Sequence, residues 1–364
     1  MRFFALAVVT FASSLAFAYP EMIRHGYVNC TACHISPAGG GVLTQYGRGL
    51  SAELLSTWGT EKEAQFMHGA LPMEKVDEWL AIGGGYRGLQ YHYENDQRKD
   101  GQWIDMQGLI ETAAKFKTWT VDFAFGVFEA NSVWKSYVSR YYVMNNLNDY
   151  VSLRAGRFTP QFGLNIPAHT SPTRGNLGFG ANKERNAFEA QYADEAWTVT
   201  GTYSESIDRT GSSEIEKAVA FKLERAVTDI IKPGISLWKG ETPSQQRQLM
   251  GLHGLIGFTK DFFLLSEIDW QETRIKDSGA INHTLSTYHK LGYEAHKGVI
   301  GFLLADGQLN KLEDPGSRVL HYGMGVQFFP RPHFALEATW TREQAPAATS
   351  VEGDYAWFLF HYYL

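Results

Sequence analysis

The segment Trp119-Thr120-Val121-Asp122-Phe123-Ala124-Phe125-Gly126-Val127 alternates large apolar residues with small or polar ones. Successive side chains of a β-strand point to opposite faces, so this period of two predicts a strand with one apolar and one polar or small-residue face. Residues 320–328 and 334–340 repeat the pattern. A sheet built from such strands would separate an apolar environment from a wet one.

Turn signals divide the chain from residue 79 onward into sixteen such segments. We expect strands at 79–95, 102–115, 118–130, 132–145, 149–158, 184–193, 195–205, 214–226, 231–240, 245–258, 261–275, 282–295, 298–310, 317–329, 332–344 and 353–364. Tight connections at Lys117, Asp194 and Thr259-Lys260 alternate with long ones at 159–183 and 206–213. An even number of strands and this alternation are typical of single-chain transmembrane barrels. The predicted fold is therefore all-β: a sixteen-stranded antiparallel transmembrane β-barrel behind a small N-terminal helical module.

The composition agrees with a membrane barrel and disfavours other classes. The 364 residues carry a net charge of −6, which gives nucleic-acid binding no electrostatic support. Aromatic residues make up 14% of the chain, whereas disordered chains are poor in them. Many expected strands begin or end in an aromatic residue, as the girdles of such barrels require, namely Trp79, Trp103, Trp119, Trp197, Trp270 and Trp340. A soluble secreted β-sandwich or barrel with inward apolar faces is the alternative.

The first eighteen residues have the pattern of a secretory signal peptide. Met1-Arg2 is a short basic start, an apolar run follows, and Ala16-Phe17-Ala18 is a small-x-small cleavage site. We expect residues 1–18 to be removed on export. Together with the barrel, export predicts a location in the bacterial outer membrane, with lipid as a partner.

The only two cysteines stand in Cys30-Thr31-Ala32-Cys33-His34, the pattern of c-type haem attachment. Two thiols one turn apart can each bind a haem vinyl group, and the adjacent His34 can then reach the iron as proximal ligand. A redox disulfide, a structural disulfide and half of a zinc site are the alternatives. A redox disulfide of the thioredoxin type would need a βαβ context, which is absent here. A structural disulfide gives no reason for the adjacent His34. A zinc site would need a second pair of ligands, which the sequence lacks. We therefore predict one covalent haem c held by Cys30, Cys33 and His34.

The sixth ligand of the iron is less clearly indicated. Candidates are His25, which a turn through Gly26 could bring back, and Met67, His68 and Met73 downstream. A His ligand lowers the reduction potential and a Met ligand raises it. His25 is narrowly preferred.

Residues 19–73 form the expected haem module, and residues 74–364 the barrel. Leu43, Tyr46, Leu50, Leu54 and Trp58 are spaced for one helix face, which we expect to cover the haem. So small a module needs support from a larger body, so we expect it to plug the lumen or lie at its periplasmic end.

The barrel interior is expected to receive a set of polar side chains: Asp105, Gln107, Glu111, Asp122, His253, Glu267, Asp269, His321, Glu337 and His361. Such an acidic lumen would favour cations, unless the charges pair with Arg140 or Arg154. The long segment 159–183 is expected to fold inward and narrow the pore.

The order of these parts resembles the fused monohaem cytochrome–porin family of the bacterial outer membrane, which includes iron oxidases. The resemblance rests on the leader, on Cys30-Thr-Ala-Cys33-His34 directly after it, and on the barrel. It implies an electron conduit rather than a conventional enzyme, with metal oxidation as an activity of some members. A periplasmic electron carrier and an extracellular electron donor or acceptor would be its partners. Two alternatives remain open: a solute-diffusion porin gated or sensed by its haem domain, and a soluble periplasmic haem enzyme.

Overall fold

The structure is a computed structural model of the chain. It describes residues 19–70, 76, 78–130, 133–168, 170–180, 182–208, 211, 214–345 and 352–364. The predicted signal peptide and Met73 lie outside these residues.

Sixteen antiparallel strands of the described chain close into one barrel, in which each strand pairs with the next and β1 pairs with β16. The strands are β1 (Leu80–Glu94), β2 (Lys99–Phe116), β3 (Trp119–Ala130), β4 (Val133–Asn146), β5 (Val151–Phe158), β6 (Arg185–Ala193), β7 (Trp197–Ser206), β8 (Lys217–Arg225), β9 (Ile231–Glu241), β10 (Gln245–Gly257), β11 (Phe262–Ile275), β12 (Ile281–His296), β13 (Val299–Leu309), β14 (Arg318–Phe328), β15 (Phe334–Gln344) and β16 (Gly353–Tyr363). The predicted number is confirmed, and every predicted boundary lies within three residues of the observed one. Closure leaves no sheet edge unpaired.

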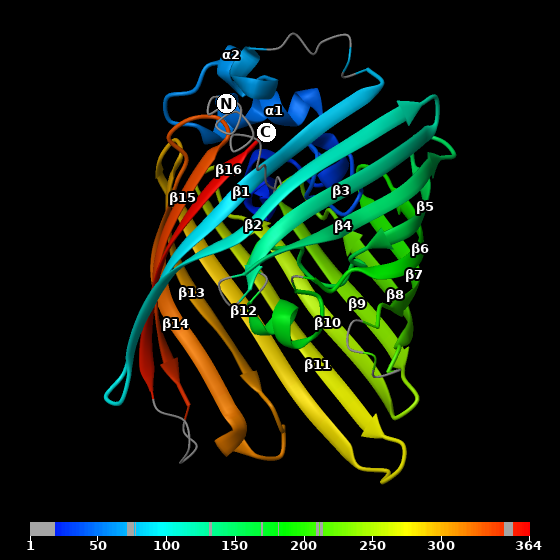
Figure 1. Cartoon of the computed structure of the whole chain (residues 1–364), viewed down its shortest axis with the longest axis vertical. Coiled ribbons are helices and arrows are strands. Elements are labelled where there is room, and N and C mark those ends of the chain that lie inside the picture. The colour runs from blue at the N-terminus through cyan, green and yellow to red at the C-terminus, as the bar shows by residue number, and fades with distance from the viewer. Residues whose placement is uncertain are drawn as a thin grey trace, which may run out of the picture.

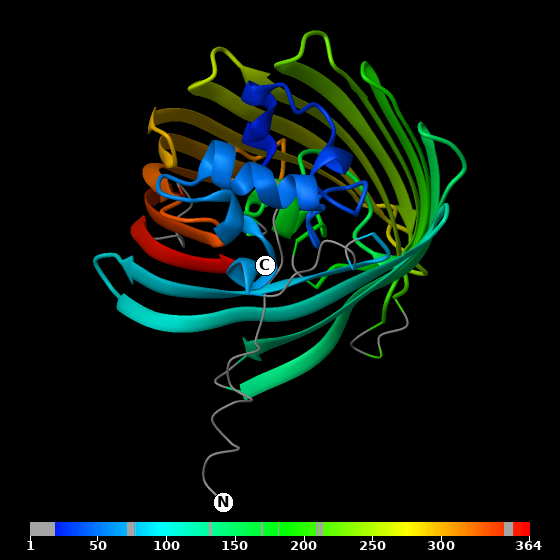
Figure 2. The same ribbon diagram turned by 90° about the horizontal axis from the view of Figure 1, so that it is seen from above.

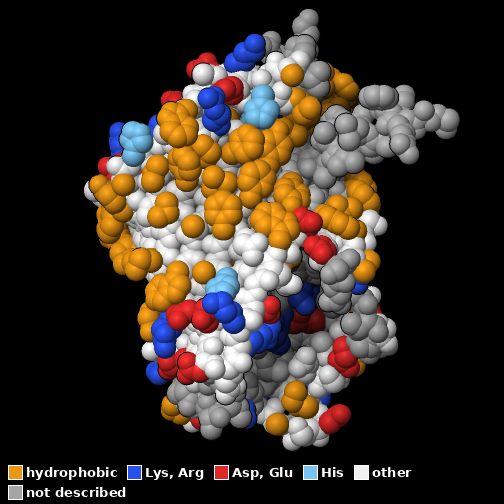
Figure 3. All heavy atoms as spheres, turned by 60° about the vertical axis from the view of Figure 1, so that its left-hand side comes forward, with side chains coloured by type: hydrophobic (Ala, Val, Ile, Leu, Met, Phe, Trp, Pro, Cys, Tyr) orange, Lys and Arg blue, Asp and Glu red, His pale blue; other side chains and the backbone are white. Residues whose placement is uncertain are grey.

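The strands place apolar side chains outside and small or polar ones inside. On β3, the side chains of Trp119, Val121 and Phe123 are 50%, 43% and 47% exposed. Between them, Thr120, Asp122 and Ala124 are buried. Figure 3 shows hydrophobic side chains gathered in a band around the visible face, with most charged side chains above and below it. This is the surface that a barrel presents to lipid.

The two ends of the barrel differ in their connections. Tight turns such as 117–118 and 297–298 join strands at the end where the C-terminus lies (Figure 1). Connections at the opposite end include the long segments 159–184 and 310–317. The predicted alternation of short and long connections is therefore confirmed.

The N-terminal segment, residues 19–70, lies within and over the tight-turn end of the barrel (Figures 1 and 2). Its elements are the 3₁₀ helices η2 (Pro20–His25), η3 (Cys30–Ala32) and η5 (Phe66–Gly69), the α-helices α1 (Gln45–Leu50) and α2 (Glu61–Ala64), and the π turn η4 (Ser51–Leu55). None of the helices in the described part of the chain is long and apolar enough to cross a membrane.

The helix predicted over 43–58 is shorter than expected. Leu43 and Leu50 are buried as predicted, but the helical run ends at Leu55, and Tyr46 and Trp58 are exposed. The run ends because the chain then docks on the barrel rim, where the Thr57 amide donates to the Phe329 carbonyl oxygen at 2.9 Å. Of the predicted helix face, Leu43 and Leu50 are therefore turned inward, whereas Tyr46 and Trp58 are not.

The segment 159–183 folds into the lumen, as predicted. Its Phe162 and Phe179 rings stack with centroids 4.8 Å apart, and both pack with Trp238 and Leu249 of the barrel wall. The Gly163 amide donates to Ser236 Oγ on β9 at 2.9 Å. We call residues 159–183 the inward loop.

Candidate functional site

The motif Cys30–His34 forms one tight turn. The amides of Cys33 and His34 both donate to the Cys30 carbonyl oxygen, at 3.2 and 3.0 Å. Both cysteines are free thiols. A single turn places the two sulfur atoms on neighbouring positions of one side, as attachment to one planar group requires.

A short hairpin after the motif holds this turn in place. The backbones of His34 and Leu43 pair in an antiparallel bridge, with Gly39, Gly40 and Gly41 in the left-handed region at its tip. Helix α1 then returns against the motif: a Cβ on Gly47 would lie 2.4 Å from the Cys33 carbonyl oxygen. Only glycine therefore permits this approach.

The motif faces an enclosed space inside the barrel, which we call the motif cavity. It encloses about 1170 Å³, including the part open to solvent. Cys30, Cys33 and His34 line it, together with apolar side chains of the N-terminal segment that include Met22, Leu43, Leu50 and Leu55. Barrel strands supply the opposite wall through Gln191, Thr198, Lys222, Glu224, Lys232 and Leu255. A largely apolar lining with a few polar side chains is typical of a cofactor site.

The ionisable groups of the motif are held neutral. Burial, followed by the nearby Arg140 guanidinium, lowers the pKa of His34 to about 4. Burial also raises the pKa of the Cys33 thiol to about 11 and that of Cys30 in the same direction. Cys30 nevertheless remains accessible, as expected of a side chain that faces a cavity rather than packed protein.

The motif residues fit the predicted haem. His34 Nδ1 is buried and has no hydrogen-bond partner within the described chain, and a neutral imidazole is the form that binds a metal ion. The thiols are unpaired and accessible from the cavity, and the lining is apolar. No described group of three or more His, Cys, Asp and Glu residues could hold a bare metal ion. Attachment of haem to Cys30, Cys33 and His34 stays a prediction.

A group of buried charged side chains borders the motif cavity. Glu224 on β8 accepts from Lys222 Nζ at 2.9 Å and from Lys232 Nζ at 3.2 Å. His253 Nε2 on β10 lies 3.1 Å from the same carboxylate. Two ammonium groups against one carboxylate leave this wall cationic, which suits a ligand that carries carboxylates.

The predicted sixth ligands do not lie on the motif cavity. The pKa of His25 is lowered by burial and then by Arg24, with Lys260 and Asp261 of the β10–β11 turn close by. His68 Nε2 lies 3.1 Å from the Tyr362 hydroxyl, and its ring packs on His333. Met67 precedes it in η5, and both residues have left-handed backbones. Met73 lies outside the described residues.

Sequence reasoning missed Met22, Lys222 and Lys232, all of which line the motif cavity. Met22 stands before the motif, and the turn through Gly26 that was proposed for His25 carries it back instead. The two lysines occupy inward positions on β8 and β9. The sequence predicted the order of these strands but not how close they come to the motif. A period-two pattern alone gives no such distance.

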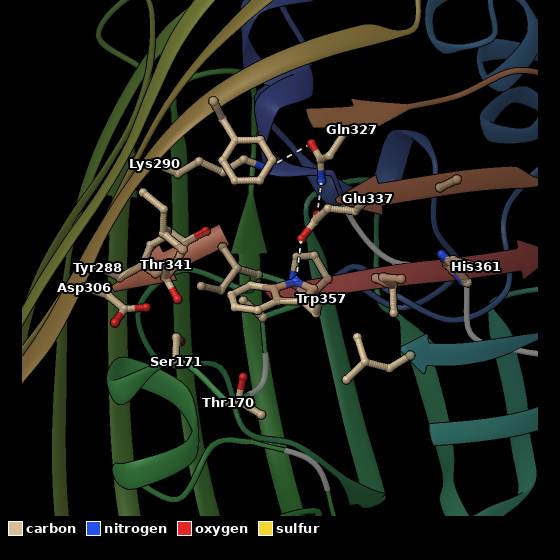
Figure 4. Close-up of a pocket in the computed structure, with 18 of the residues that line it drawn as sticks. Thr170, Ser171, Tyr288, Lys290, Asp306, Gln327, Glu337, Thr341, Trp357 and His361 are labelled. Carbon is tan, nitrogen blue, oxygen red and sulfur yellow. Dashed lines mark hydrogen bonds between the residues drawn. The ribbon is translucent and has the colours of Figure 1, made fainter. Parts of the chain in front are cut away.

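A second and larger space, the lumen cavity, lies between the N-terminal segment and the inward loop (Figure 4). It encloses about 1770 Å³, including its open part. A hydrogen-bonded chain runs along one wall of it, on strands β12, β14 and β15: Lys290 Nζ donates to Gln327 at 2.9 Å, and Gln327 donates to Glu337 at 2.8 Å. The Trp357 indole donates to the same carboxylate at 3.4 Å. Most of the lining is apolar, and these hydrogen-bonded side chains form a polar strip within it.

Nine of the ten polar side chains predicted for the interior point inward: Glu111, Asp122, His253, Glu267, Asp269 and His361 are buried, and Gln107, His321 and Glu337 are half-buried. The prediction is wrong for Asp105, because the pairing of β1 with β2 shifts by one residue between Arg87 and Gly88. Asp105 therefore lies opposite Gly88 on the outer face, where it accepts hydrogen bonds from the Tyr86 hydroxyl and from Trp103 Nε1. The proposed pairing is also present, since Arg140 Nε lies 2.7 Å from Glu111. Arg154 instead pairs with Glu189 at 2.5 Å. Glu267 and Asp269 form no ion pair with any described Arg or Lys.

The chain is similar to solved outer-membrane porins. Pseudomonas putida OprB matches with a TM-score of 0.62 at 9% identity, over 85% of this chain and 99% of that one. An anion-selective porin from Comamonas acidovorans matches with a TM-score of 0.60 at 10% identity, over 78% and 99%. Outer-membrane expressed OmpT of Vibrio cholerae gives 0.58 at 7%, over 78% and 98%.

No protein-family model matches the chain. No curated protein matches it either. At identities this low, the structural likeness establishes the fold, a porin-type antiparallel β-barrel. The barrel half of the predicted resemblance is thereby confirmed, and its haem half stays a prediction.

Proposed function

We propose that the protein is a diffusion channel of the bacterial outer membrane for small polar solutes, narrowed by its N-terminal segment and its inward loop. The observation that carries this proposal is the lumen cavity, a space inside a closed barrel with an apolar exterior; its lining is largely apolar but carries the hydrogen-bonded side chains Lys290, Gln327 and Glu337. Barrels of sixteen strands leave an interior wide enough for water. Here the N-terminal segment and the inward loop occupy part of that interior. The C-terminus and the tight turns would face the periplasm, as in other barrels of this kind.

Size rather than charge is expected to select the solute. Most lumen charges are already paired, as in Arg140–Glu111 and Arg154–Glu189. Paired charges present a weaker net field to a passing ion than a ring of one sign would. The cation preference suggested by acidic residues in the sequence is therefore not part of the proposal.

Swelling of liposomes in sugars of graded size tests the channel. Arg24 holds the N-terminal segment to the wall: its guanidinium pairs with Glu294 on β12, donates to the Lys260 carbonyl oxygen at 2.6 Å, and lies over the Phe263 ring. Arg24→Met keeps the apolar contact and removes the charge. We expect the parent to admit only the smallest sugars and Arg24→Met to admit larger ones.

Lys276→Met is the matched control, because Lys276 pairs with Glu241 at 2.6 Å on the surface of the far end. It should behave like the parent. If neither the parent nor Arg24→Met passes the smallest solute, the barrel is not a diffusion channel.

We further propose that the N-terminal segment carries one covalent haem c on Cys30 and Cys33, with His34 as ligand, and acts as the gate or sensor of the channel. The support is the unpartnered buried His34 Nδ1 beside two free thiols on an apolar cavity. When bound, the haem would supply one-electron chemistry. Helix α1 and the β8–β10 wall both border the motif cavity and would hold the haem between them.

Electron transfer across the membrane is the second candidate function, favoured by the position of the motif inside the barrel wall rather than on a separate domain. The apolar band of such a barrel is about 25 Å tall, a long span for one centre. Proteoliposomes with a trapped acceptor and an external donor test it. A conduit predicts transfer by the parent and its loss in His34→Ala, whereas equal rates in both would exclude a conduit.

A further inference from the structure

In the proposed haem site, Cys30 and Cys33 would hold the porphyrin and His34 would bind the iron from one side. A side chain on the other face must therefore line the same cavity. Among the described residues on that lining, Met22 is the one that adds an uncharged thioether or imidazole to those of the motif. Its side chain is half-buried and also packs against the core around Phe329 and Leu265.

The backbone explains how Met22 comes to lie beside a motif that follows it. Helix η2 ends at Gly26, whose φ of 85° is left-handed. This turn reverses the chain, and the Tyr27 amide then donates to the Met22 carbonyl oxygen at 3.4 Å. Tyr27 stands only three residues before Cys30. The hydrogen bond to Tyr27 therefore holds Met22 near the start of the motif.

The rest of η2 is locked to the barrel, which prevents His25 from taking this place. Arg24 is buried against Glu294 and the Lys260 carbonyl oxygen. His25 follows it toward the β10–β11 turn, with its Nε2 buried and without a hydrogen-bond partner in the described chain. Moving His25 onto the cavity would break the Arg24 contacts.

The remaining donors on the lining are engaged elsewhere. Lys232 Nζ donates to the Val28 carbonyl oxygen at 2.7 Å and to Thr198 Oγ1 at 3.0 Å. Lys222 Nζ pairs with Glu224 at 2.9 Å. An ammonium nitrogen has no lone pair to give, so neither lysine is a ligand in this state.

We propose that the Met22 sulfur is the sixth ligand of the haem iron, opposite His34. The assignment rests on the proposed haem. A thioether ligand raises the reduction potential relative to a second imidazole. The centre would therefore accept electrons readily and resist binding of external ligands.

Spectroscopy of the full-length protein, matured in a host with cytochrome c biogenesis machinery, tests the assignment. A pyridine haemochrome assay first establishes that haem is attached. The oxidised parent should show the far-red sulfur-to-iron charge-transfer band, and the reduced parent a strongly upfield-shifted methionine methyl resonance. Met22→Leu, which keeps the apolar volume, should retain the haem, lose both signals and bind carbon monoxide. Met22→His should restore a low-spin iron at a lower potential.

Met67→Leu is the matched control and should leave both signals unchanged. Heat-modifiable gel mobility confirms that each variant has formed the barrel. Two outcomes would overturn the assignment of Met22 and leave the haem proposal standing. One is a haem-loaded Met22→Leu protein with an unchanged spectrum, and the other is a haem-loaded parent without the sulfur signals. A parent without attached haem overturns the haem proposal together with it.

Discussion

The ammonium group of Lys232, on strand β9, donates a hydrogen bond of 2.7 Å to the carbonyl oxygen of Val28, two residues before Cys30. The neighbouring Asn29 side chain donates to the Asp194 carbonyl oxygen at 2.8 Å and accepts from Thr198 at 3.0 Å. The two residues directly before the motif, Val28 and Asn29, are thus held by the barrel wall. The motif cavity therefore exists only once the barrel has closed.

Lys232→Met is expected to loosen the approach to the motif. Glu224 keeps Lys222 and His253 as partners, so the variant loses mainly its anchor on Val28. Hydrogen bonds to charged groups contribute about 1.5–3 kcal/mol, so local opening should become roughly tenfold more frequent or more. The rate of maleimide labelling of Cys30, measured on haem-free protein, should rise accordingly.

Lys222→Met is the control, because it removes an ammonium group from the same carboxylate but leaves the hydrogen bond from Lys232 to Val28 in place. Its labelling rate should stay within about twofold of the parent. Equal acceleration by both variants would mean that the charge of the wall, not the Val28 anchor, holds the motif.

Phe123→Arg is expected to prevent stable insertion of the barrel into a bilayer. Phe123 lies in the middle of β3 with its side chain 47% exposed on the apolar exterior. An arginine at the bilayer midplane of such a barrel costs about 2–4 kcal/mol and near the interface about 0–1. Folding into lipid vesicles, followed by urea titration, should show this loss.

Val133→Arg provides the comparison, since Val133 is 58% exposed but begins β4 at the end away from the tight turns. It should cost far less than Phe123→Arg. Similar costs at both positions would contradict a membrane band centred on the middle of β3.

The barrel was predictable because its information is local. On β3 the alternation of Val121, Asp122, Phe123 and Ala124 fixes which side chain faces outward, and a shift of one residue would exchange the two faces. The tight connections between strands mark their ends directly. Sixteen strands then follow from counting, and closure follows because an open edge would be left unpaired.

The arrangement around the motif was not predictable in the same way. Cys30, Cys33 and His34 could be named from their spacing, but the choice between Met22 and His25 depends on a contact between Arg24 and Glu294, 270 residues apart. Nothing in the local pattern of residues 19–26 indicates that contact. The left-handed backbones of Met67 and His68 likewise arise from packing on the barrel rim.

Acidification is expected to weaken the packing of the N-terminal segment on the rim. Burial, followed by the nearby His68, lowers the pKa of His333 from its ordinary 6.5 to about 4. The folded chain thus binds fewer protons than the unfolded chain between these values, so stability is complete above 6.5 and falls as pH drops toward 4. From about pH 7.5 to about pH 5, the free energy of unfolding should fall by about 2 kcal/mol from this group.

Urea titrations of the parent and His333→Gln at both pH values measure this contribution. The variant should lose less stability on acidification, because its side chain does not titrate. His92→Gln, at a half-buried strand position, should retain the slope of the parent. A parent slope that survives in His333→Gln would assign the acid sensitivity to another group.

Gly163→Ala is expected to widen the pore by displacing the inward loop. Gly163 has a φ of 58°, and a Cβ there would lie 1.5 Å from Glu267 Oε1, which is fully buried on β11 and cannot retreat into solvent. Gly178 of the same loop has a φ of 81°, but the nearest atom to its Cβ would be 3.5 Å away. Each alanine destabilises the folded state by about 1–2 kcal/mol through its left-handed backbone, and only the alanine at position 163 also collides with a neighbouring atom.

Single-channel conductance should therefore rise in Gly163→Ala and stay near the parent value in Gly178→Ala. Because backbone strain is common to both variants, a rise confined to Gly163→Ala assigns the narrowing of the pore to the contact between the inward loop and Glu267, and unchanged conductance in both would remove the loop from that role.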